Sequence, residues 1–120
     1  MKRDEDLLRQ LLFDLEQEDD FVSAAFVEHM NMPKEDRVKR GHVLLLADAG
    51  LVAPMSGEWS TFRLTNDGHD FIAAVRQDTV WNKTKETASK AGSVTLSMLF
   101  EIAVALGKEK LRQATGLALS

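Results

Sequence analysis

The sequence predicts a mainly α-helical fold that contains one small β-hairpin. Apolar residues recur every three or four positions through most of the 120 residues, the spacing of helices that bury one face. Between Leu51 and Leu64 this spacing gives way to two short extended segments on either side of a Ser-Gly-Glu turn. No cysteine is present, which excludes disulfides and cysteine-bound zinc.

Two helices are expected before Pro33. The first follows five leucines on one stripe, at positions 7, 8, 11, 12 and 15, and Asp4, Glu5 and Asp6 suit its positive N-terminal end. The second follows an i, i+3, i+4, i+7 spacing of Val22, Ala25, Phe26 and His29. Pro33 ends this second helix, because the residue before a proline disfavours helical backbone.

A third helix is expected from Pro33 to Ala49. Gly50 would end it in a left-handed conformation, and Leu51 would fold back onto its last turn. The face expected to be buried comprises Val38, Gly41, His42, Leu45 and Ala49. The opposite face comprises Arg37, Arg40, Leu44 and Ala47, with Lys39 on the flank.

The hairpin is expected to pair Leu51–Met55 with Trp59–Leu64, and Pro54 marks an edge strand. Thr65 is expected to cap the next helix, which would continue through Val80 and Trp81 toward Lys90, either straight or with a kink near Asn82. A last helix is expected from Thr95 to about Gln113.

The last helix carries an apolar stripe of Leu96, Leu99, Phe100, Ala103 and Leu106. Because Met98, Ile102 and Ala105 lie off that stripe, the helix needs cover on more than one side. We expect a homodimer in which this helix contacts its counterpart. The alternative is that the leucine-rich first helix supplies the cover.

The expected order of elements, three helices, a hairpin and further helices, is typical of a winged helix-turn-helix. We therefore expect a winged-helix domain over residues 1–80. A C-terminal helical extension over residues 81–120 is expected to pack on it.

Several segments resemble one family. They are Lys2-Arg3-Asp4 with Asp6-Leu7, Leu64-Thr65 with Gly68-His69-Asp70-Phe71, and the stretch Asp78-Thr79-Val80-Trp81-Asn82-Lys83-Thr84-Lys85-Glu86. The chain is similar, over nearly its whole length, to the small phage and prophage family known as domain of unknown function twenty-five-thirteen. The resemblance implies a winged-helix core and a phage or prophage setting, and it brings no catalytic residues.

The residue types favour a protein that is not an enzyme. His29, His42 and His69 lack the spacing of a helical zinc site, and no Gly-rich phosphate loop or Gly-x-Ser-x-Gly motif occurs. We expect no catalytic residue, no metal site and no cofactor. His42 is expected to be a core histidine whose ring nitrogens find partners within the fold.

One function that fits is double-stranded DNA binding by a transcriptional regulator. The N-terminal half of the third helix would enter the major groove. The candidate contacts to bases and phosphates are Lys34, Arg37, Lys39 and Arg40, with Arg63 on the wing. Lys83 and Lys85 could add contacts to the DNA backbone.

The alternative is a protein-interaction module that binds a host regulator or a defence complex. The net charge of −4, a turn without basic residues at 55–58, and Glu35, Asp36 and Asp48 on the third helix count against DNA binding. The winged-helix order of elements outweighs them, so DNA binding is the function we expect first. Val43, Leu44, Ala47 and Trp59 would form an apolar contact surface. The acidic cluster Glu16, Glu18, Asp19 and Asp20 could meet a basic partner.

No apolar signal segment opens the sequence, and no apolar run approaches the ~20 residues that span a bilayer. We therefore expect a cytoplasmic protein without membrane contact.

Overall fold

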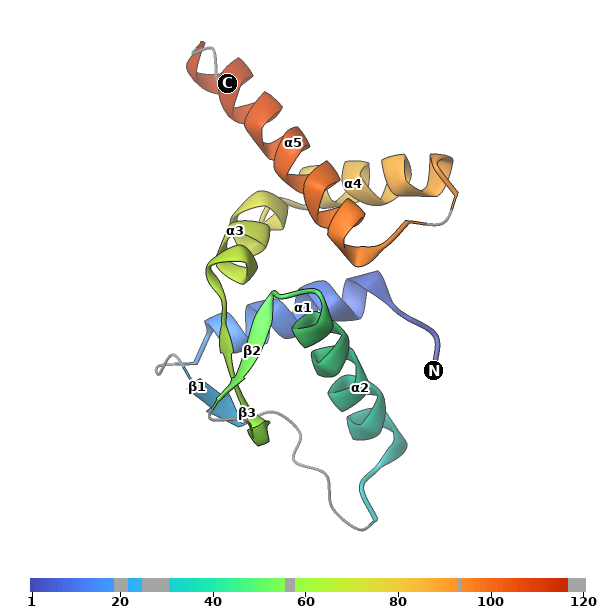
Figure 1. Cartoon of the computed structure of the whole chain (residues 1–120). Coiled ribbons are helices and arrows are strands. Elements are labelled where there is room, and N and C mark those ends of the chain that lie inside the picture. Colours follow the sequence, from blue (N-terminus) through green and yellow to red (C-terminus); the bar gives the residue numbers. More distant parts are fainter. Residues whose placement is uncertain (19–21, 25–30, 56–57, 93, 117–120) are drawn as a thin grey trace. The chain divides into compact units, whose positions relative to one another are not determined.

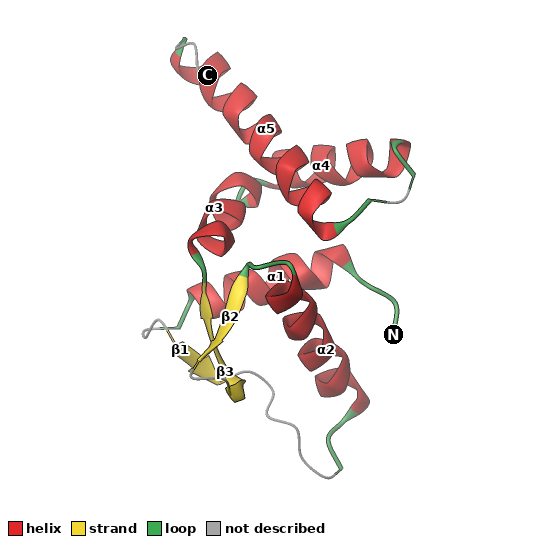
Figure 2. Cartoon of the chain, viewed as in Figure 1, coloured by secondary structure: helices red, strands yellow, loops and turns green. Residues whose placement is uncertain are grey.

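The computed structural model describes residues 1–18, 22–24, 31–55, 58–92 and 94–116 (Figure 1). In this part the chain is mainly helical, with an antiparallel hairpin as predicted (Figure 2). The helices are α1 (Glu5–Glu16), α2 (Lys34–Asp48), α3 (Asn66–Val75), α4 (Asp78–Lys90) and α5 (Leu96–Thr115). The strands are β1 (Val22–Ala24), β2 (Val52–Met55) and β3 (Glu58–Leu64).

The chain forms two compact units, Met1–His69 and Asp70–Ser120, which we describe separately. The first unit ends within α3. The winged-helix domain expected over residues 1–80 and its extension over 81–120 stay predictions. In the first unit, α1 packs on α2 and β3. The unit's core comprises Leu8, Leu11, Leu12, Met32, His42, Val43, Leu46, Leu51, Val52 and Phe62.

The sheet has three strands in the order β1-β3-β2, so the hairpin β2–β3 gains β1 on the far side of β3. The register pairs Val22 with Arg63 and Ala24 with Thr61. The helix predicted over residues 22–29 is therefore wrong for Val22–Ala24, and residues 25–30 lie outside the described part. Pro54 lies in the edge strand β2, as predicted, and the register of the β2–β3 pair shifts between Pro54 and Met55.

The turn after α2 has the predicted conformation. Gly50 has a φ of +78° and donates its N–H to the carbonyl of Ala47. The N–H of Leu51 reaches back to the carbonyl of Leu46, and the Leu51 side chain is buried. These two bonds form a Schellman motif, which satisfies helix-end carbonyls that would otherwise lack partners.

The first turn of α3 is hydrogen-bonded to the Gly50–Leu51 segment that ends α2. Thr65 caps α3, as predicted, because its Oγ1 accepts the Gly68 N–H at 3.1 Å. The same hydroxyl donates to the Gly50 carbonyl, and the Thr65 N–H donates to the Leu51 carbonyl. A Cβ on Gly68 would lie 2.1 Å from the Leu51 oxygen. The two motifs around Gly50 and Gly68 thus form one junction, which we call the Gly50–Gly68 junction.

The second unit is a helical cluster centred on Phe71. Its ring stacks on Phe100 at 5.5 Å between centroids and meets Trp81 edge-on at 6.2 Å. The prediction of one helix from residue 66 toward Lys90 is wrong, since the backbone turns at Gln77 before α4 begins. The break lies there and not near Asn82, which is inside α4. A straight helix would hold Phe71 and Trp81 about 15 Å apart along its axis, so the break allows their contact.

Helix α5 confirms the predicted last helix. Thr95 caps it by accepting the Met98 N–H at 3.1 Å. Of the predicted stripe, Leu96, Leu99 and Ala103 are buried. Met98 is 45% exposed, and the homodimer expected from this surface stays a prediction.

Candidate nucleic-acid interface

The outward face of α2 is set by the residues that the helix buries. His42, Val43 and Leu46 are each at most 1% exposed. At about 100° per residue, Arg37 lies opposite Leu46 on the helix. The buried face is therefore rotated from the expected one, and the expectation that Val43 forms an exposed contact surface is wrong.

Three of the predicted DNA-contacting residues share this outward face. Lys34 and Arg40 lie within about 60° of Arg37 around the helix axis. Lys34 and Arg37 are exposed, and Arg40 is half-buried. The N-terminal half of α2 thus presents three cations on one side.

Lys39 does not join these cations. It lies about 160° from Arg37, on the same side of the helix as Glu35. Its Nζ is 3.3 Å from the Glu35 carboxylate, an i, i+4 ion pair. The structure therefore gives Lys39 a local partner away from the outward face.

Arg63 is also separate from the cluster. It is exposed on β3 and pairs in register with Ala53, at the start of β2. Strand β2 follows the C-terminal end of α2, whereas Lys34 and Arg37 lie at the other end of this helix, which is about 22 Å long. Arg63 donates from Nη1 to the Leu64 carbonyl at 3.2 Å.

His42 is the core histidine that the sequence predicted. Its Nε2 accepts the Asp4 N–H at 2.9 Å, and its Nδ1 lies 2.8 Å from the Val38 carbonyl. A neutral ring with its proton on Nδ1 satisfies both contacts. The Asp4 side chain also caps α1 by accepting the Leu7 N–H. Asp4 therefore connects the start of α1 to the middle of α2.

The sequence alone did not indicate that Asp4 and His42 are partners, since 38 positions separate them. Asp4 stood out only as part of a motif and as a helix-start acid. The Thr65-x-x-Gly68 spacing did carry a usable signal, because a threonine cap bonds the N–H three residues later.

The other candidates do not assemble into a site in the described residues. His69 is exposed in the first turn of α3, and His29 lies outside the described part. Among the described residues no group of histidine and carboxylate side chains could hold a metal ion. In the second unit, Lys83 lies 3.8 Å from Glu86, and the Lys85 ammonium lies 5.6 Å from the centre of the Trp81 ring.

The remaining candidates for a protein-binding surface are only partly described. Leu44 and Ala47 are half-buried, and the Trp59 side chain lies outside the described part, as do Asp19 and Asp20. Within the described residues, no helix is both long enough and apolar enough to span a bilayer.

Comparison with known proteins identifies relatives of this chain. The model of the family described as "Hypothetical protein (DUF2513)" matches residues 2–94. An "Uncharacterized protein" of Haemophilus influenzae is 33% identical over 104 residues, which cover 82% of this chain and 86% of that protein. No solved structure matches the chain. The chain is therefore a member of the DUF2513 family.

Proposed function

We propose that this protein is a winged-helix DNA-binding regulator of phage or prophage transcription, with α2 as its recognition helix. The observation that carries the proposal is the grouping of three cations on one face of α2. Lys34, Arg37 and Arg40 share the outward face, which Asp36 borders about 40° from Arg40, whereas Glu35 lies on the other side and pairs with Lys39. Lysine and arginine on such a face suit guanine edges and phosphates in the major groove.

The surrounding elements support this role for α2. The Gly50–Gly68 junction fixes the end of α2 against the hairpin and the start of α3. Val43 and Leu46 bury the inner side of the helix in the first unit. A rigid helix with one charged side turned outward is the part that a helix-turn-helix protein inserts into DNA.

The test is fluorescence anisotropy with labelled duplexes from the region upstream of the gene and a scrambled duplex of equal length. The native protein is expected to prefer one upstream duplex, and its affinity is expected to fall steeply with salt. Arg37→Ala should weaken specific binding by about 1–3 kcal/mol, and Lys34→Ala should lower the salt slope by about 1.

Lys39→Ala is the matched control, since it removes a cation from the same helix but from the opposite side. It should leave affinity and salt slope unchanged. No binding to any duplex, or an equal loss in Lys39→Ala and Arg37→Ala, would contradict the proposal.

The charge of the first unit favours a second candidate, a module that binds a basic protein partner. Residues 1–69 contain eight basic and fourteen acidic side chains, a net charge of −6. Such a charge opposes non-specific attraction to phosphates and favours a cationic protein surface. Under this candidate the DNA experiment shows no binding at low salt.

A further inference from the structure

We propose that the groove between α4 and α5 is a binding site for a small organic carboxylate. The groove lies wholly within the second unit and has a volume of about 300 Å³. Thr79, Val80 and Lys83 line it from α4, and Leu106, Lys110 and Gln113 line it from α5. This volume is at the lower end of ligand-binding pockets. The inference does not rest on DNA binding by α2.

Lys110 holds a fixed positive charge at the groove. Its ammonium donates to the side-chain carbonyl of Gln77 and, at 2.9 Å, to the hydroxyl of Thr79. Both acceptors are neutral, so they orient the ammonium without cancelling its charge. An ammonium has three donors, which leaves one N–H for an anion in the groove.

Lys83 adds a second cation on the α4 side. Its Nζ is 3.8 Å from the Glu86 carboxylate, which lies nearer to Lys90, at 3.2 Å. One carboxylate therefore serves two ammonium groups, and this triad keeps a net positive charge. The pair at Lys83 is exposed, so it competes weakly with a bound anion.

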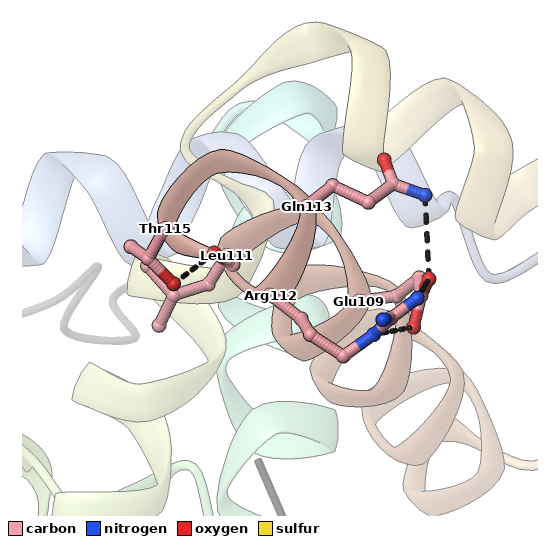
Figure 3. Close-up of polar contacts among 5 residues, drawn as sticks. All are labelled: Glu109, Leu111, Arg112, Gln113 and Thr115. Atoms are coloured by element: carbon pink, nitrogen blue, oxygen red, sulfur yellow. Dashed lines mark hydrogen bonds and ion pairs between the residues drawn. The ribbon is translucent and has the colours of Figure 1, made fainter. Parts of the chain in front are cut away.

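Glu109 is the acidic residue at the rim, and its charge is already paired (Figure 3). The Arg112 guanidinium binds the carboxylate through two nitrogens, with Nε at 3.0 Å, and Gln113 donates to it at 3.3 Å. These contacts, with Arg112 first, lower the pKa of Glu109 and keep it ionised. The rim thus presents Glu109 as one half of an ion pair, and the excess charge of the groove stays positive.

The apolar part of the groove selects among anions. Val80 is 7% exposed and Leu106 is half-buried, and both belong to the lining together with the two lysines. The volume equals on the order of ten water molecules, which fits a short acyl chain with its carboxylate. Inorganic phosphate could bind the two ammonium groups, but it would leave this apolar surface exposed to water.

The test uses sodium butyrate as the probe and follows backbone amide and methyl NMR signals of the full chain. Butyramide, a neutral molecule of the same shape, and sodium chloride at equal ionic strength are the comparison solutes. We expect saturable shifts at Thr79, Val80 and Leu106 with butyrate, and an affinity at least about tenfold lower for butyramide.

Two variants test the charges. Lys110→Met keeps the length of the side chain and is expected to weaken butyrate binding by roughly tenfold, whereas Lys108→Met, exposed on the same helix outside the groove, should leave it unchanged. Lys83→Met tests the second cation, because this change leaves the contacts of Lys110 with Gln77 and Thr79 in place. It should also weaken butyrate binding. The absence of saturable shifts at concentrations of about 50 mM, far above the millimolar range of weak ligands, would overturn the proposal. Equal binding of butyramide, or native affinity in both groove variants, would also overturn it.

Discussion

The two units of this protein are stabilised in different ways. The first combines a buried apolar core with a few points of close backbone contact, where Gly50, Thr65 and Gly68 bring chain segments together through hydrogen bonds. The second depends on side-chain packing around Phe71, between Phe100 and Trp81. In the first unit a single added methyl group should therefore be damaging, whereas in the second the damage should follow the volume removed.

Removal of the central ring should have the largest effect. Phe71 is 2% exposed and contacts two other aromatic rings. Phe71→Ala should lower the free energy of unfolding by about 3–5 kcal/mol, and Phe71→Leu should lower it by less. Urea denaturation followed by circular dichroism measures both. Equal losses in the two variants would show that volume does not govern this unit.

A methyl group at the Gly50–Gly68 junction should have the next largest effect. The Cβ of Gly68→Ala would lie 2.1 Å from the Leu51 carbonyl oxygen, so backbone must shift. We expect a loss of about 2–3 kcal/mol in the same denaturation experiment.

Gly107→Ala is the matched control for this change. It lies inside α5, where a new Cβ would be no nearer than 3.7 Å to Ala74. Alanine is the better helix former, so the free energy of unfolding of this variant should rise by about 0.5–1 kcal/mol. A loss in Gly107→Ala as large as in Gly68→Ala would remove the contrast between the units.

A smaller effect is expected at Gly50, where a side chain has room but the left-handed backbone conformation disfavours it. Its φ is +78°, and a Cβ there would meet no atom within 4 Å. Gly50→Ala should cost about 1 kcal/mol, and Gly50→Asn should cost less because asparagine tolerates left-handed backbone. Thermal denaturation of the two variants checks this order, and no change in Gly50→Ala would contradict it.

The smallest effect is expected from the ion pairs on α4. A hydrogen bond from Lys90, followed by the charges of Lys83 and Lys90, lowers the pKa of Glu86 below its usual value of 4.5. A carboxylate with a lowered pKa stabilises the fold above the pKa of the unfolded chain, and the contribution disappears as pH falls through the folded value. Because the pair is exposed, Glu86→Gln should leave stability at neutral pH nearly unchanged.

An NMR titration of the Glu86 carboxyl group measures the pKa directly. Lys90→Met should move it back toward 4.5, and added salt should do the same. If the Glu86 pKa stays the same in Lys90→Met and in added salt, these lysines are not the cause of the lowered pKa.

Local signals in the sequence predicted the helix ends and the hairpin. Gly50, Thr65 and Thr95 each act through bonds within a few residues, which a local pattern can specify. The residues that pair over long distances were not predictable in this way. Val22 follows a helical spacing with later apolar residues, yet it pairs with Arg63 in the sheet.

The candidate interface was predicted in part for the same reason. Lys34, Arg37 and Arg40 could be read from the sequence as cations of one helix. Their common face depends on which side of α2 is buried, and this depends on contacts of His42, Val43 and Leu46 with the rest of the first unit. Helical periodicity alone left that rotation open, and so Lys39 was grouped with them.

The pairing of β1 with β3 has a consequence for the order in which the chain can fold. Val22 meets its partner about forty residues later, and the strand has only three residues. Closing such a long loop has a high entropic cost, and a three-residue strand forms few hydrogen bonds to offset it. During synthesis, α1 and α2 can associate as soon as both have emerged, but the sheet must wait until Leu64 is free of the ribosome. The first unit should therefore acquire its third strand last, after the hairpin has formed.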